Sequence, residues 1–205
     1  MLRVGVLVSG RGSNLEALLQ ATRQPDFPAE IALVGCNRAD APAMAIATEH
    51  QVQVALADRA VLKKRDDRQS ALLEELKEAR VDLLVLAGFD EILTQEFLQT
   101  FAGRLINTHP SLLPAFGQTM HAVQQALDHG VKVTGCTIHL VTEDVDAGPI
   151  LLQQCVDVRD DDDVESLHAR IRAEEHRLLP EAIRAFAEGR VRIEGKRARV
   201  LRSIN

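Results

Sequence analysis

Tryptophan and tyrosine are absent from this sequence of 205 residues, and only six phenylalanines supply aromatic rings. A hydrophobic core must therefore be aliphatic, and the 46% of hydrophobic residues can supply one. Apolar runs are all shorter than the roughly 20 residues that cross a bilayer, so we expect no membrane contact. The formal net charge of −6 argues against a protein that binds nucleic acid by neutralising phosphates over a broad face.

Cysteine is also scarce, and the histidines are not clustered. Cys36, Cys136 and Cys155 form an odd set without C-x-x-C spacing, which predicts reduced thiols in a cytoplasmic protein. The seven histidines show no regular ligand spacing, so we predict no metal site. The apolar residues 1–8 lack a cleavage site and run into a glycine-rich loop, which indicates a first strand and not a signal peptide.

The first half of the chain alternates between strand-like and helix-like segments. This order predicts a mostly parallel, twisted Rossmann-like sheet with helices on both faces. In the second half, two β-rich runs joined by an acidic loop predict an antiparallel pair, and a long helix follows. We expect one domain spanning residues 1–205, with an N-terminal half of about 1–100 and a C-terminal half of about 101–205. The expected strands are 3–8, 31–36, 52–56, 82–87, 104–108, 133–140 and 150–158, and the expected helices are 14–22, 41–49, 68–79, 94–101, 121–128 and 164–188.

The segment from Asn107 to Pro114 (Asn-Thr-His-Pro-Ser-Leu-Leu-Pro) is the most informative stretch. Side chains at positions i and i+2 of a strand point the same way, so Asn107 and His109 should lie side by side. Ligands bind at the edge where strands of an open α/β sheet end. A carboxamide beside an imidazole can hold a carbonyl oxygen while it becomes negative. The alternative is a strand end whose Asn caps a turn and whose His is merely buried.

The first strand ends in Ser-Gly-Arg-Gly-Ser-Asn-Leu, residues 9–15, which open the first helix. Backbone N–H groups at a helix start attract anions, and glycines let a phosphate approach closely. Leu15 stands where a dinucleotide fingerprint needs its third glycine, and the Walker and nucleophile-elbow patterns are absent. The loop therefore predicts a site for a single phosphate, with a tight turn without a ligand as the alternative.

Other charged residues could complete a site. Asp146 precedes Ala-Gly-Pro, a turn that would fix the direction of its carboxylate near His109, although a solvated turn residue is the simpler interpretation. His139 could line the same cleft or be a core histidine. Basic residues at 63, 64, 65 and 68 indicate a solvated helix start, or a rim that attracts an anionic substrate.

Several motifs occur together in a recognisable order. They are Ser-Gly-Arg-Gly-Ser-Asn-Leu at 9–15, Leu-Ala-Gly-Phe at 86–89, Asn-Thr-His-Pro-Ser-Leu-Leu-Pro at 107–114, Gly-Cys-Thr-Ile-His at 135–139, Asp-Val-Asp-Ala-Gly-Pro at 144–149 and Glu-His at 175–176. Together they resemble the folate-dependent phosphoribosylglycinamide formyltransferase family over nearly the whole chain.

The resemblance implies an activity and a set of site residues. The activity is transfer of a formyl group from 10-formyltetrahydrofolate, a co-substrate, to the amine of glycinamide ribonucleotide in purine synthesis, in a monomer or homodimer. The N-terminal half would bind phosphate, and the C-terminal half would bind folate and catalyse. The implied catalytic residues are Asn107, His109 and Asp146; the implied substrate-binding residues are Gly12, Ser13, Asn14 and Glu175; and the implied folate-binding residues are Arg65, Phe89, Asp90, Glu91, Ile92, Leu93, Val141, Thr142, Glu143 and Asp144.

Two kinds of alternative stay open. Methionyl-tRNA formyltransferase would need a second, basic domain, and formyltetrahydrofolate hydrolase would need an extra N-terminal domain. The other alternative is a catalytically silent domain that binds folate or a nucleotide. Glu91, where the family usually has Arg, keeps it open, and the intact set of Asn107, His109 and Asp146 argues against it.

Overall fold

The structure, a computed structural model, describes residues 1–202 and divides into two compact units. The first unit is Met1–Ile106 and the second is Asn107–Asn205. The expectation that the two halves form one domain stays a prediction.

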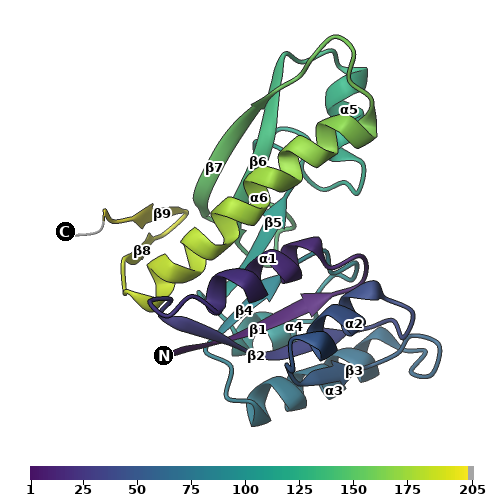
Figure 1. The fold of residues 1–205 in the computed structure, drawn as a ribbon, viewed down its shortest axis with the longest axis vertical. Coiled ribbons are helices and arrows are strands. Elements are labelled where there is room, and N and C mark those ends of the chain that lie inside the picture. Colours follow the sequence, from purple (N-terminus) through teal and green to yellow (C-terminus); the bar gives the residue numbers. More distant parts are fainter. Residues whose placement is uncertain (203–205) are drawn as a thin grey trace. The chain divides into compact units, whose positions relative to one another are not determined.

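The first unit is a parallel sheet in the strand order β3-β2-β1-β4 (Figure 1). Central β4 is buried along its whole length, as its sequence Leu-Leu-Val-Leu requires. The strands are β1 (Leu2–Val8), β2 (Ala29–Cys36), β3 (Val54–Leu56) and β4 (Leu83–Leu86).

Helices connect these strands and pack on the sheet. They are α1 (Ser13–Thr22), α2 (Pro42–Glu49), α3 (Arg65–Glu78) and α4 (Gln95–Thr100). Gly35 of β2 lets α3 approach, because a Cβ there would lie 2.5 Å from Leu7 and 3.3 Å from Leu72 of the helix. Helix α3 begins at Arg65, three residues before its predicted start, since Asp66 and Asp67 favour its first turn.

The second unit contains an antiparallel strand pair with a long helix across it (Figure 1). Strand β5 (Leu105–His109) crosses the boundary between the units, and β6 (Val133–Leu140) and β7 (Ile150–Asp157) follow it in the sheet order. Helix α6 (Val164–Ala187) packs against β6 and β7, and α5 (Ala122–Asp128) packs against α6. Beyond α6, β8 (Val191–Glu194) and β9 (Arg197–Val200) form a separate antiparallel pair.

Helix α6 starts where the acidic run 160–163 ends. Asp163 is the N-cap, and its carboxylate accepts from the backbone N–H of Ser166, whose hydroxyl faces the N–H of Asp163. This capping box satisfies two amide donors that a helix start leaves unpaired. The prediction of a mostly parallel α/β sheet with an antiparallel C-terminal part is confirmed.

Candidate active site

The structure brings Asn107, His109 and Asp146 together within the second unit. Asn107 and His109 are the third and fifth residues of β5, so their side chains leave the same face of the strand. His109 is 5% exposed, and its Nδ1 lies 3.4 Å from Oδ2 of Asp146. Residues 37 apart in the chain therefore meet at the carboxyl end of a strand, as the sequence predicts.

The Asp146 loop has a backbone that holds its carboxylate inward. Asp146 adopts a φ of 55°, in the left-handed region that Asp tolerates better than most residues, and its side chain is 10% exposed. Gly148 permits the close return of the loop, because a Cβ there would lie 1.8 Å from the carbonyl oxygen of Leu140. The backbone N–H of Gln118 donates to Oδ2 of Asp146 at 2.8 Å.

His139 on β6 is the fourth member of this cluster. Its Nε2 lies 3.1 Å from the amide nitrogen of Asn107 and 3.7 Å from Oδ1 of Asp146. Its Nδ1 lies 2.9 Å from the carbonyl oxygen of Leu140, which can only accept, so Nδ1 carries the proton. Burial lowers the pKa of His139 below its usual 6.5, against the opposing effects of the Leu140 carbonyl and the Asp146 carboxylate. A neutral ring accepts through Nε2, so Asn107 donates to His139.

Both ring nitrogens of His109 face oxygen acceptors. Nδ1 faces Asp146, and Nε2 lies 2.8 Å from the backbone carbonyl of Phe116. Phe116 and Gln118 have φ values of 53° and 60°, a conformation that is costly for such residues. The loop that covers His109 is therefore strained.

The loop after β1 has the shape of an anion site within the first unit. Gly12 is the N-cap of α1 with a φ of 82°, and a Cβ there would lie 2.7 Å from the Cβ of Ala43. A Cβ on Gly10 would meet nothing within 4 Å, so the loop is open on that side. The first N–H groups of a helix lack intrahelical acceptors, and those of Ser13 and Asn14 lie at this start.

Comparison with known proteins agrees with this geometry. Residues 2–183 match the family described as formyl transferase. The chain belongs to the formyl transferase family. It is 46% identical over 202 residues to phosphoribosylglycinamide formyltransferase of Mycobacterium tuberculosis, covering 98% of this chain and 93% of the relative. It superposes with a TM-score of 0.95 and 48% identity on glycinamide ribonucleotide transformylase 1 from Symbiobacterium toebii, covering 98% of this chain and 95% of that one.

Longer relatives also match this chain. The trifunctional purine biosynthetic protein adenosine-3 of Bos taurus is 42% identical over 199 residues. That match covers 97% of this chain, which spans 19% of the length of the relative.

Arg65 is the first residue of α3, and the other predicted folate-binding residues fall into two segments, each described within its own unit. After β4, Phe89 is half-buried, Ile92 is 66% exposed and Leu93 is buried. Asp90 is paired with Arg59, and Glu91 is turned inward onto Arg68 of α3. In the second unit, Val141 is half-buried, and the exposed residues of that segment are Thr142, Glu143 and Asp144.

Glu175 lies on α6 and is 4% exposed. The hydroxyl of Thr108 donates to its Oε1 at 3.0 Å. Because side chains alternate along β5, Thr108 leaves the face opposite to Asn107 and His109. Glu175 is therefore bonded to β5 on the face opposite to Asn107 and His109.

Sequence reasoning missed several of these partners. The carbonyl of Phe116 and the N–H of Gln118 belong to a loop in which both of these residues are left-handed without being glycines. The sequence therefore does not indicate the conformation of the loop. Thr108 lies between Asn107 and His109 on a strand. Strand alternation could therefore have indicated that its side chain faces the opposite side, towards α6. The expectation that the basic residues 63–68 form a solvated helix start is wrong for Arg68, which is 8% exposed, because the helix begins earlier and turns Arg68 inward.

Within residues 1–202, no group of three or more His, Cys, Asp or Glu side chains is arranged to hold a metal ion. No helix in the same range is long and apolar enough to cross a bilayer.

Proposed function

We propose that this chain transfers a formyl group from 10-formyltetrahydrofolate to the amine of glycinamide ribonucleotide. The observation that supports this most is a connected cluster in a member of the formyl transferase family: His109 and His139 both face Asp146, and Asn107 is bonded to His139. Acyl transfer needs donors at the carbonyl oxygen and a path for one proton, and this cluster contains both.

Asn107 is the first donor to the formyl oxygen. One of its two amide hydrogens is donated to Nε2 of His139, which holds the plane of the amide. The other hydrogen remains to donate to the oxygen as negative charge develops on it. A donor fixed in advance needs no reorganisation during the reaction.

His109 is the second donor and is held by Asp146. Because Nδ1 of His109 faces the Asp146 carboxylate, Nε2 is the nitrogen that would reach the formyl oxygen. In the structure, Nε2 is bonded to the backbone carbonyl of Phe116. Catalysis therefore requires the Phe116 loop to release this nitrogen when substrates bind. The strained backbone at Phe116 and Gln118 lowers the cost of that release.

The bond changes balance without a covalent enzyme intermediate. The amine nitrogen bonds to the formyl carbon, and the bond from that carbon to the folate nitrogen breaks. One proton leaves the amine and one is gained by the folate nitrogen. Asp146, in contact with both histidines, is the group that relays this proton, through water where distance requires it.

The remaining residues bind the two substrates. The N–H groups of Gly12, Ser13 and Asn14 receive the phosphate at the start of α1. Glu175, held by Thr108, receives the ribose hydroxyls. The folate side is formed by Arg65, the segment Phe89–Leu93 and the segment Val141–Asp144. The reaction takes place in the cytoplasm, in keeping with three free cysteines among the described residues, and the active form is a monomer or a homodimer.

The deciding experiment mixes the purified protein with glycinamide ribonucleotide and 10-formyltetrahydrofolate and follows folate absorbance. We expect release of tetrahydrofolate that depends on both substrates. Asn107→Ala should lower kcat by about a hundredfold, the cost of one lost oxyanion donor. Release without the ribonucleotide would indicate a hydrolase, and binding without release would indicate a silent domain.

A further inference from the structure

The segment that follows β4, residues 87–94, is tied to α3 and to the end of β2 by one buried carboxylate. The side chain of Glu91 is 10% exposed. Its Oε1 accepts from Nε of Arg68 at 2.9 Å and from Asn37 at 3.0 Å, and its Oε2 accepts from Gln69 at 3.3 Å. The carboxylate of Glu91 is thus fully engaged by side chains of the protein.

Arg68 connects this carboxylate to a second segment. Its side chain is 9% exposed, and its Nη1 donates to the carbonyls of Leu62 and Lys63 at 2.5 and 2.9 Å. The guanidinium therefore joins the segment 62–64, which precedes α3, to the segment that carries Glu91. A planar fork with several donors can make these bonds at once, and an ammonium cannot.

Gln69 secures the same segment from the next position on α3. It is fully buried, donates to the carbonyl of Ile92 at 3.0 Å and accepts from the N–H of Thr94 at 2.7 Å. The side chain of Ile92 is left 66% exposed at the tip. The segment is therefore fixed at its base, and its tip at Ile92 remains exposed.

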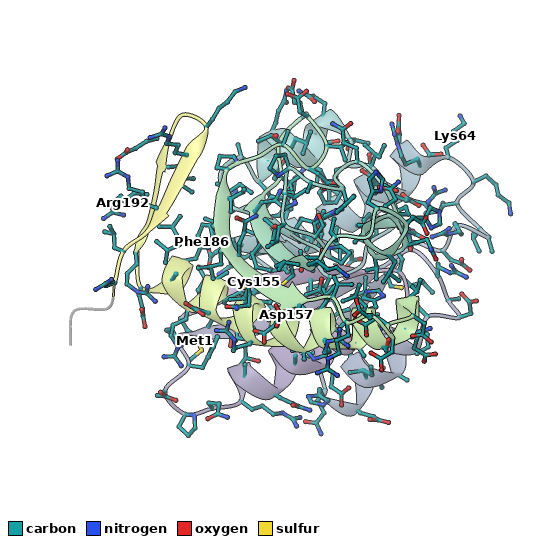
Figure 2. The ribbon with its side chains drawn as sticks, turned by 90° about the horizontal axis from the view of Figure 1, so that it is seen from above. Met1, Lys64, Cys155, Asp157, Phe186 and Arg192 are labelled. Carbon is teal, nitrogen blue, oxygen red and sulfur yellow. The ribbon has the colours of Figure 1, made fainter. Side chains whose placement is uncertain are left out.

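The segment 62–64 ends in exposed cations. Lys63, Lys64 and Arg65 are all exposed, and Figure 2 shows the side chain of Lys64 extending away from the ribbon. Cations on a rim attract an anionic ligand tail. The Arg68–Glu91 pair therefore sets the spacing between the exposed tip at Ile92 and a basic rim.

A buried ion pair adds little net stability, because desolvation of both charges offsets their attraction. Its better-attested use is to select one conformation. We propose that Arg68 and Glu91 are positioning residues, which hold the segments 62–64 and 87–94 in the arrangement that binds 10-formyltetrahydrofolate. This inference rests on the proposed function, and it assigns the contribution of Glu91 to its pairing with Arg68.

The test compares Arg68→Met, Glu91→Gln and the double variant with the wild type. Each variant should raise the KM for 10-formyltetrahydrofolate about tenfold, and the double variant should be no worse than the more affected single variant, because the two residues act as one unit. The KM for glycinamide ribonucleotide and the kcat at saturating folate should change less than about twofold. Glu74→Gln, which removes an exposed ion pair with Lys77 on the same helix, is the matched control and should leave all constants unchanged.

The double variant keeps the test decisive, because it leaves no unpaired buried charge even if a single variant fails to fold. A double variant with the wild-type KM for folate would overturn the proposal. A raised KM for folate in Glu91→Gln but not in Arg68→Met would also overturn the proposal, because that result would indicate direct contact of Glu91 with the ligand. A double variant that does not fold would show a role in stability instead. Failure of the proposed function is distinct, because the wild type itself would then release no tetrahydrofolate.

Discussion

Asn107 donates to His139, and the chemistry of the surroundings fixes the direction of this hydrogen bond. The carbonyl of Leu140 requires a proton on Nδ1 of His139, so Nε2 is an acceptor. The bond determines which end of the carboxamide faces the ring. In the proposed mechanism, His139 therefore acts on the reaction through Asn107.

Two substitutions of His139 separate this positioning role from mere packing. The amide oxygen of His139→Gln can replace Nε2 as the acceptor, whereas His139→Asn is too short to reach Asn107. We expect the Gln variant to keep most of the activity and the Asn variant to lose about tenfold or more in kcat, approaching the loss of an oxyanion donor. Steady-state kinetics with both substrates measures this, and equal activity in the two variants would contradict it.

His139 also predicts a dependence of stability on pH. Its folded pKa lies below the unfolded value of 6.5, so the unfolded chain binds a proton first as pH falls. The neutral His139 ring makes its full contribution to the free energy of unfolding above pH 6.5. This contribution is lost as pH falls towards the folded pKa, at up to about 1.4 kcal/mol per pH unit.

Urea unfolding at pH 7.5, 6.5 and 5.5 should show this decline in the free energy of unfolding of the wild type. His139→Gln lacks the titrating ring and should show a smaller decline over the same range. Parallel curves for the two proteins would mean that another group causes the dependence.

Much of this arrangement could be predicted from the sequence, because it follows from local periodicity. Strand alternation placed Asn107 and His109 on one side, and the carboxyl end of a strand is where a ligand site is expected. The turn after Asp146 indicated a fixed carboxylate. The pairing of Asn107 with His109 therefore follows from local pattern, whereas the approach of Asp146 to His109 was expected chiefly from the family resemblance.

The contacts that escaped prediction depend on pairs distant in the chain or on loop backbone. Arg68 was expected at a solvated helix start, and only the inward turn of Glu91, 23 residues later, gives it a buried partner. Phe116 adopts a left-handed conformation without a glycine to signal it, so its carbonyl contact with His109 could not be predicted.

The cysteines should differ in reactivity in the native protein. Cys155 is exposed, whereas Cys36 and Cys136 are buried. Burial raises the pKa of both buried thiols, and for Cys136 burial together with the nearby Glu175 carboxylate raises the pKa to about 12. The thiolate is the reactive form, so a thiol reagent at pH 8 should label Cys155 alone, and all three after unfolding in urea. Rapid native labelling of Cys136 would contradict the packing of α6 on β6.

The phosphate loop allows a comparison of glycines that separates folding from binding. Gly12→Ala would combine a left-handed φ of 82° with a Cβ 2.7 Å from Ala43. Strain in that region costs about 1–2 kcal/mol, so the free energy of unfolding should fall by at least that much. Gly10→Ala meets nothing within 4 Å and should be as stable as the wild type.

Gly10→Ala should nevertheless impair substrate binding, because its methyl group occupies the open side of the loop where the phosphate would approach. We expect a rise in the KM for glycinamide ribonucleotide with an unchanged KM for 10-formyltetrahydrofolate. Gly130→Ala, at a φ of 66° in open space, measures the backbone strain alone and should leave both KM values unchanged. A Gly10→Ala variant that binds the ribonucleotide normally would place the phosphate elsewhere and remove the loop after β1 from the substrate site.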